Sequence, residues 1–356
     1  MTFYLYYYLT ILSLLVLEHF ARSARLFFAR SARLFFVIAI LLTIFISGFR
    51  YNTGYDFFNY VRFYKYHLPS DIEPLFAYSI KLFNYISNEP QLMFFSYSLA
   101  TIWILVLAIK RFTKYTKTSF LIFLLIPGLF LNSFSTIRQS LASVILFYAL
   151  SFLILENRRL MFIVLSVVSA MFHYAAIVPA IIFILGENFL KKEYKKITYI
   201  LLILFSVALY HLNIAQLLLS FTFGRYSAYM DYIHNVSTIK IVVSNLFVLF
   251  LIFIRRCFIK NATDIYLLNL VLIGTLIINV FAHCTPITRL SYYFLIAQIV
   301  IVPKLIYSFK DNDMKLIFLV AFMCYYSFMI GNALMVDLNL ASYPKMTPYE
   351  NYLFRR

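Results

Sequence analysis

The sequence predicts an all-α integral membrane protein with about 10–12 transmembrane helices. The first observation is composition, since 63% of the 356 residues are hydrophobic and only 13% are charged, whereas soluble domains carry about 25% charged residues. The second is the presence of long apolar runs, such as 35–49, 92–109 and 197–210. Each run can cross, or nearly cross, a hydrocarbon layer of about 30 Å. The third is that basic residues cluster between the runs.

The basic clusters orient the predicted helices, because short cytoplasmic loops of membrane proteins are enriched in Lys and Arg. The clusters assigned to the cytoplasm lie within 22–33, 110–117, 158–159, 191–196, 255–260 and 304–315. Membrane topology therefore explains the net charge of +17, and nucleic acid is not an expected partner. With this orientation both termini lie on the outer side.

The predicted spans follow from these runs and clusters. In chain order they cover 2–18, 34–49, 91–109, 118–134, 137–155, 197–219, 240–254, 264–282, 289–307 and 314–332. The first lacks the basic start and the cleavage site of a signal peptide, so it is expected to remain as a helix. Segment 160–185 is different, because two helices broken near His173 would each reach only about 20 Å. A broken or re-entrant helix pair is expected there, covered by protein or by a watery cavity.

All these segments are expected to form one membrane domain over residues 1–356, with two outer loops. The longer loop, 50–90, contains amphipathic helices, and one of them opens at Glu73-Pro74 because proline suits the first helical position. The second outer loop covers 220–239. An exact repeat, Phe20–Phe27 followed by Phe28–Phe35, falls in the first cytoplasmic loop, where its arginines are interpreted as topogenic charge.

The predicted outer side collects ionisable residues, which are costly near hydrocarbon and are therefore functional candidates. They are Arg50, Asp56, Glu73, Arg138, His173, Arg225, Asp231 and Arg289. Structural ion pairs, or side chains that reach the lipid headgroups, are the alternative interpretation for any one of them. As a group, the four arginines leave scope for an anionic ligand.

Two of the arginines follow helix-start signals. Arg138 comes after the polar stretch 132–136, and Arg289 comes after 285–288, both typical of helix N-termini. Free backbone N–H groups at such a terminus favour a phosphate, and a guanidinium adds bidentate hydrogen bonds. Two such sites on one face suit a diphosphate, and Arg50 and Arg225 are expected to complete the cage.

Three residues are candidate general bases for removing a proton from an acceptor hydroxyl: Asp56, Glu73 and His173. The sequence leaves open which of them acts. If a helix starts at Asp56, then Asn59 and Tyr60 share its face. The sequence has no Walker loop, no Asp-x-Asp motif and no metal-ligand spacing among its cysteines, so neither a metal nor another cofactor is expected.

Several short motifs occur in a defined order. They are Arg50-xxx-Gly54-x-Asp56-xxx-Tyr60, Glu73-Pro74, Arg138-Gln139, Phe172-His173, Arg225-Tyr226 and Arg289-Leu-Ser-Tyr-Tyr293. In this order they resemble the EpsG-like family of bacterial membrane proteins, which are grouped with the Wzy-type O-antigen and capsule polymerases. The resemblance covers residues 45–185 well and continues more loosely beyond them.

The resemblance implies a GT-C-like helical architecture and a polysaccharide polymerase. Such an enzyme transfers an undecaprenyl-diphosphate-linked glycan onto a second lipid-linked repeat unit, at the periplasmic face of the bacterial inner membrane. The implied catalytic residues are Asp56, Glu73 and His173, and the implied diphosphate-binding residues are Arg50, Arg138, Arg225 and Arg289. The implied substrate contacts are Asn59, Tyr60, Gln139, Tyr226 and Tyr293.

The expected partners are the lipid-linked donor and acceptor, the bilayer and, as a candidate, a chain-length regulator protein. Two other functions stay open. An O-antigen ligase, or another lipid-diphosphate-dependent glycosyltransferase, would use the same donor with another acceptor. A transporter of lipid-linked oligosaccharide would need a cationic cavity that is reachable from both sides, and inverted repeats of the kind common in transporters are not evident here.

Overall fold

The computed structural model describes residues 1–23, 29–66, 68–212, 236–340 and 344–354, and it is all-α apart from one pair of two-residue strands. The predicted fold class, a polytopic helical membrane protein, is confirmed. The Cα positions divide the chain into two compact units. Unit 1 comprises 1–151, 160–176 and 321–356, and unit 2 comprises 152–159 and 177–320.

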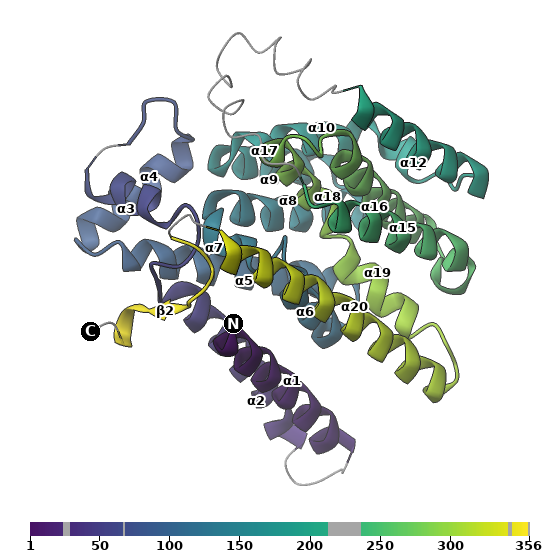
Figure 1. Cartoon of the computed structure of the whole chain (residues 1–356), viewed down its shortest axis with the longest axis horizontal. Helices are drawn as coiled ribbons and strands as arrows, with labels where there is room; N and C mark the ends of the chain where they lie inside the picture. Colours follow the sequence, from purple (N-terminus) through teal and green to yellow (C-terminus); the bar gives the residue numbers. More distant parts are fainter. Residues whose placement is uncertain (24–28, 67, 213–235, 341–343, 355–356) are drawn as a thin grey trace. The chain divides into compact units, whose positions relative to one another are not determined.

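Unit 1 contains both ends of the chain (Figure 1). Its elements are α1 (Thr2–Ser23), α2 (Ala29–Gly48), β1 (Arg50–Tyr51), α3 (Phe57–Lys65), α4 (Pro74–Ile86), α5 (Gln91–Phe112), α6 (Thr116–Leu125), α7 (Asn132–Ser135), most of α8 (Ile137–Glu156) and α9 (Arg159–Phe172), η1 (Tyr174–Ala176), the later part of α20 (Asn312–Asn339), β2 (Glu350–Asn351) and η3 (Tyr352–Phe354). Helix α2 packs against both α1 and α5.

Unit 2 is built around α16, which packs against α12 and α15. Its elements are the end of α8, the first residue of α9, α10 (Ile177–Leu185), α11 (Glu187–Leu190), α12 (Lys196–His211), α15 (Thr238–Phe258), α16 (Ala262–Val280), α17 (Thr285–Thr288), η2 (Arg289–Ser291), α18 (Tyr292–Leu295), α19 (Gln298–Ile306) and the start of α20. The buried Asn269 of α16 donates to the Leu190 carbonyl oxygen at 2.8 Å and accepts from the Tyr199 hydroxyl at 3.0 Å. Its amide is therefore satisfied inside an apolar bundle.

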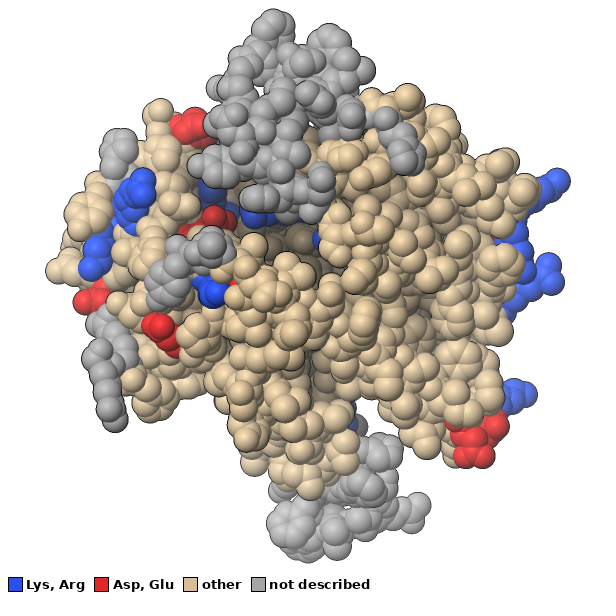
Figure 2. All heavy atoms as spheres, in the orientation of Figure 1, with Lys and Arg blue, Asp and Glu red and all other residues tan. Residues whose placement is uncertain are grey.

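Several described helices are long and apolar enough to span a membrane. They are α5, α8, α15, α16, the run Arg289–Ile306 and α20. Large apolar side chains on them point outward, among them Trp103 of α5, Leu246 of α15 and Leu316 of α20. Figure 2 shows a face that is largely uncharged, with Lys, Arg, Asp and Glu gathered in a few places. Such a surface suits lipid better than water.

One predicted span, 118–134, is wrong. Helix α6 ends at Leu125, and Ile126 adopts an extended conformation with φ −85° and ψ 108°. Pro127 explains this, because the residue before a proline is driven out of the helical region. Turns and the short helix α7 follow, up to the start of α8.

The C-terminal segment holds the start of the predicted outer loop 50–90 of unit 1. Strand β2 pairs antiparallel with β1, with Arg50 opposite Asn351. The buried carboxylate of Asp337 accepts hydrogen bonds from the Tyr55 hydroxyl at 2.7 Å and from the Thr347 N–H at 2.8 Å. Gly54 has a φ of +103°, and a Cβ there would lie 2.3 Å from the Phe134 carbonyl oxygen. Only glycine fits this position.

Candidate active site

The centre of the candidate site is the carboxylate of Glu73, at the N-terminus of α4. Pro74 occupies the first turn, as the sequence predicts, and Glu73 itself has an extended backbone with φ −61° and ψ 136°. Its side chain makes no capping hydrogen bond to its own helix and is only 6% exposed. The carboxylate is therefore directed toward other elements.

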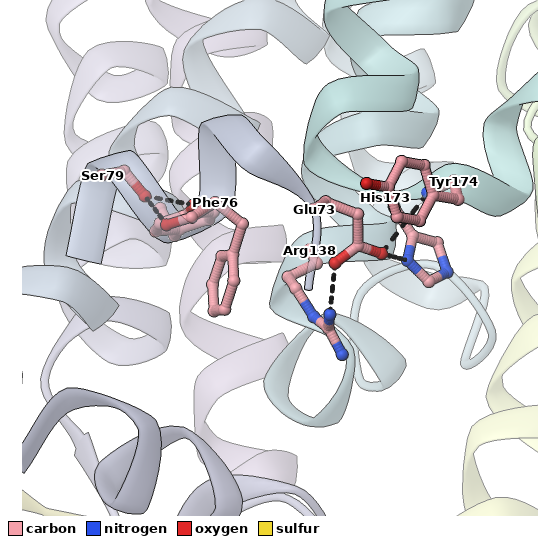
Figure 3. Close-up of polar contacts among 7 residues, drawn as sticks. Glu73, Phe76, Ser79, Arg138, His173 and Tyr174 are labelled. Atoms are coloured by element: carbon pink, nitrogen blue, oxygen red, sulfur yellow. Dashed lines mark hydrogen bonds and ion pairs between the residues drawn. The ribbon is translucent and has the colours of Figure 1, made fainter. Parts of the chain in front are cut away.

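Two side chains and one backbone group hold this carboxylate (Figure 3). An Nη1 hydrogen of Arg138, on α8, is donated to Oε2 in a short ion pair. The Nδ1 atom of His173 lies 2.8 Å from Oε1, and the Tyr174 N–H donates to the same oxygen at 3.3 Å. Groups that lie 65 to 101 residues after Glu73 in the sequence thus meet at its carboxylate.

The break between α9 and η1 places His173 at this point. Helix α9 ends at Phe172, and the His173 N–H still donates to the Ser169 carbonyl oxygen at 3.0 Å. The Ser169 hydroxyl donates to the Ala142 carbonyl oxygen of α8 at 2.7 Å, which fixes the end of α9 against α8. The imidazole is partly exposed, at 26%. It is therefore fixed on one side and accessible on the other.

Arg138 begins α8, as the sequence predicts, since the helix starts at Ile137. Its guanidinium carbon lies 5.0 Å from the centre of the Phe76 ring and 5.9 Å from that of Tyr60. A guanidinium next to aromatic faces is stabilised by the ring quadrupoles. Its side chain is 24% exposed, and only one of its five N–H groups is used by Glu73.

Electrostatics keep Glu73 ionised. Burial alone would raise the pKa of this carboxyl, but the hydrogen bond with His173 and the charge of Arg138 outweigh burial and lower the pKa to about 2. A carboxylate of such low basicity is a poor general base near neutral pH. It can instead orient the imidazole, because an Nδ1–H donated to a carboxylate leaves Nε2 as the proton acceptor.

The predicted face of Asp56, Asn59 and Tyr60 is only partly formed. Helix α3 starts after Asp56, and Tyr60 is buried, packing edge-on against Phe76 at 5.9 Å between ring centres. Asn59, the preceding residue, is exposed. Tyr60 therefore belongs to the wall beside Arg138, whereas Asn59 points away from it.

Within the described residues, the hydrogen-bond partners of the Glu73 carboxylate do not include the remaining predicted site residues. Arg50 is buried, 1% exposed, and donates through Nη1 to the Ser47 carbonyl oxygen. Gln139 is buried near the start of α8. Arg289 belongs to unit 2, and the prediction that it begins a helix is wrong, because residues 285–288 already form α17. The buried Tyr293 of α18 lies in the same unit.

Arg225, Tyr226 and Asp231 lie outside the described residues. Within the described part of the chain, no group of three or more His, Cys, Asp or Glu side chains gathers as metal ligands would.

Some of the groups around the carboxylate are not marked by any motif in the sequence. The Tyr174 N–H is a backbone donor, and no sequence signal marks it. Phe76 lies three residues after Glu73 on α4, and Ser79 hydrogen-bonds the Tyr97 hydroxyl at 2.8 Å. Helical spacing after Glu73-Pro74 is the one signal that could have found Phe76.

Comparison with known proteins supports the resemblance seen in the sequence. The model of the EpsG family matches residues 33–351. No curated protein and no solved structure matches the chain. The matched range includes Glu73, Arg138 and His173, so the whole candidate site lies within the part of the chain that the family covers.

Proposed function

Because the chain belongs to the EpsG family, an integral membrane family with a polysaccharide polymerase-like role, we propose that it extends a glycan carried by undecaprenyl diphosphate. The donor glycan is transferred onto the sugar of a second lipid-linked repeat unit. The reaction takes place at the outer face of the bacterial plasma membrane, in a GT-C-like architecture. The observation that carries this proposal is the Glu73–Arg138–His173 cluster.

His173 is the proposed general base. Its Nδ1 faces an ionised carboxylate, so Nε2 is left to accept the proton of the acceptor hydroxyl. The acceptor oxygen then bonds to the anomeric carbon of the donor glycan, and the bond from that carbon to the diphosphate oxygen breaks. Undecaprenyl diphosphate leaves with the bonding electron pair, and the imidazolium later loses its proton to solvent.

Arg138 is the proposed contact for the leaving diphosphate. Glu73 uses one of its N–H groups, and its side chain remains 24% exposed. Guanidinium groups aimed at a developing negative charge stabilise it in the transition state. That Arg225 and Arg289 also contact the diphosphate stays a prediction from the sequence. Glu73 is then a positioning residue, which holds the arginine and the imidazole together.

The test uses purified protein and a defined lipid-linked repeat unit, with product length read on a gel. His173→Ala should lower the rate of polymerisation by at least about 100-fold, the usual contribution of a general base. Asp56→Asn tests whether Asp56 is the general base instead. Arg62→Ala, at an exposed position of α3, is the control and should keep the wild-type rate. Full activity of His173→Ala together with inactive Asp56→Asn would move the base to Asp56.

The ligase differs from the polymerase only in its acceptor, so the same assay separates them. A ligase would transfer the glycan to a lipid A-type acceptor and would leave lipid-linked repeat units unextended. Extension of the repeat units by the purified chain alone supports the polymerase.

A further inference from the structure

Arg50 is a buried cation whose hydrogen-bonding groups are only partly used. It follows the last residue of α2 closely, and its side chain is enclosed in unit 1 at 1% exposure. Its Nη1 donates to the Ser47 carbonyl oxygen. Within the described residues, neither Nε nor Nη2 has a hydrogen-bond partner. A guanidinium remains charged in proteins. Leaving these two buried N–H groups without a hydrogen-bond acceptor therefore lowers the stability of the folded protein.

The surroundings of Arg50 compensate its charge only in part. The guanidinium carbon lies 4.6 Å from the centre of the Phe94 ring and 5.5 Å from that of Phe134. The C-terminus of α2 supplies the negative end of a helix dipole. These contacts attract a cation without taking up its in-plane N–H groups. A hydrogen-bond acceptor in the guanidinium plane is still needed.

A narrow cavity beside Arg50 offers such a place. It is lined by Arg50, by the small polar residues Ser47, Ser98, Thr101, Ser133 and Ser140, and by Tyr97, Ile102 and Ile137. Among the described residues, the Ser140 hydroxyl has one long side-chain contact, 3.5 Å, to the Thr136 hydroxyl, so its proton can turn toward the cavity. The cavity has room for about one water molecule. Two linked phosphates do not fit into it.

The cavity is separate from the Glu73 cluster. On α8, Ile137 and Ser140 line the cavity, and a spacing of three residues puts them on one helix face. Arg138 projects about 100° away around the helix and binds Glu73 instead. The two arginines therefore serve different volumes on different sides of the start of α8.

We propose that Arg50 and the Ser140 hydroxyl form a site for a single anionic atom, either a halide ion or one terminal oxygen of a phosphate. Nε–H, Nη2–H and a hydroxyl proton would converge on that atom. Charge-assisted hydrogen bonds of this kind are strong in a sheltered site. The halide case stands independently of the proposed function. The phosphate case rests on it, because the donor diphosphate would then supply the oxygen.

The experiment measures thermal unfolding of the purified full chain in detergent, without glycan substrate. In the first arm, sodium chloride or sodium bromide replaces sodium gluconate at constant ionic strength. In the second arm, sodium pyrophosphate is titrated in gluconate. A specific anion should raise the unfolding midpoint by about 2 °C for each tenfold rise in concentration above its Kd. Ser140→Ala should weaken this response at least about tenfold in concentration.

Ser143→Ala is the matched control, since Ser143 is a buried serine of the same helix that does not line the cavity. It should respond as the wild type does. Broadening of the 35Cl resonance by folded wild-type protein gives a second readout that depends on no variant. Arg50→Lys, which keeps the charge and loses the planar donors, should abolish both signals.

Each outcome decides the matter. A halide response that Ser140→Ala weakens assigns a resident halide. A response to pyrophosphate alone, with the same dependence on Ser140, assigns a phosphate oxygen. No response in either arm, or a response that is equal in Ser140→Ala and Ser143→Ala, overturns the site and leaves water as the partner of Arg50. Polymerase activity is not measured, so failure of the proposed function would not imitate failure here.

Discussion

Glu73 in unit 1 and Glu187 in unit 2 are carboxylates that each bind two basic side chains. They differ in how far away their partners lie in the sequence. Glu187 accepts from Lys191 at 2.6 Å, one helical turn away, and from Arg159 at 3.2 Å. The partners of Glu73 are 65 and 100 residues away. A local pair can form as soon as its helix forms, whereas the Glu73 cluster requires three packed segments.

Solvent exposure separates the two regions further. Arg159 and Lys191 are 65% and 35% exposed, compared with 24% and 26% for Arg138 and His173. The Glu187 side chain is itself as buried as that of Glu73, at 7% against 6%, but water screens an ion pair through its exposed partners. The cluster at Glu73 is sheltered, and one of its members is a histidine, the side chain suited to proton transfer near neutral pH. This difference is why we propose a chemical role for the Glu73 cluster and a supporting role for Glu187.

The largest expected effect is on the rate of polymerisation, and substituting each of the two carboxylates tests it. Glu73→Gln should lower the rate of polymerisation by at least about 100-fold, because the imidazole loses the acceptor that sets its tautomer. Glu187→Gln should stay within about twofold of the wild-type rate, since neither of its partners, Arg159 and Lys191, belongs to the Glu73 cluster. Initial rates on a defined lipid-linked repeat unit measure both. Equal effects in the two variants would remove the distinction between the regions.

The next effect concerns stability. Arg138→Ala leaves the buried Glu73 carboxylate without its cation and should lower the free energy of unfolding by about 3 kcal/mol. Arg159→Ala removes a largely exposed partner and should cost less than about 1 kcal/mol. Denaturant unfolding in a mild detergent compares them. A cost for Arg159→Ala as large as that for Arg138→Ala would contradict this view.

A smaller effect on the free energy of unfolding tests how the loop around Gly54 is held against Phe134. Gly54→Ala should lower the free energy of unfolding by about 2 kcal/mol, because an alanine there combines a positive φ with a clash against the Phe134 backbone. Gly331, in α20, has open space around it, and a methyl group added there would meet no neighbouring group within 4 Å among the described residues. Gly331→Ala should therefore raise stability by about 0.5–1 kcal/mol. The same unfolding measurement gives both values, and a neutral Gly54→Ala would refute the proposed anchoring.

The smallest effect is a pH dependence. The pKa of Glu73 is lowered from 4.5 in the unfolded chain to about 2 in the folded protein. Its ionised form therefore stabilises the fold fully above about pH 4.5, and this contribution disappears as the pH falls through about 2. The difference in unfolding midpoint between wild type and Glu73→Gln should therefore shrink as the pH falls from about 4.5 toward 2. A difference that stays the same over this acidic range would argue against a lowered pKa at Glu73.

Local signals in the sequence identified several features that the structure confirms. The hydropathy of long runs predicted a helical membrane protein, and Glu73-Pro74 and the polar stretch before Arg138 predicted the starts of α4 and α8. These features depend on residues that are near one another in the chain. The early end of the helix predicted at 118–134 also has a local cause, since Pro127 drives Ile126 out of the helical region.

The sequence by itself determined the helical class, the apolar surfaces and the set of charged residues from which a site could be built. The tertiary structure alone decided that Glu73 takes Arg138 and His173 as partners and that Arg50 faces a separate, one-atom cavity. It also showed that Asp337 holds the C-terminal segment. The physical reason is that helix formation follows from neighbouring residues, whereas contacts between distant residues follow from how the helices pack.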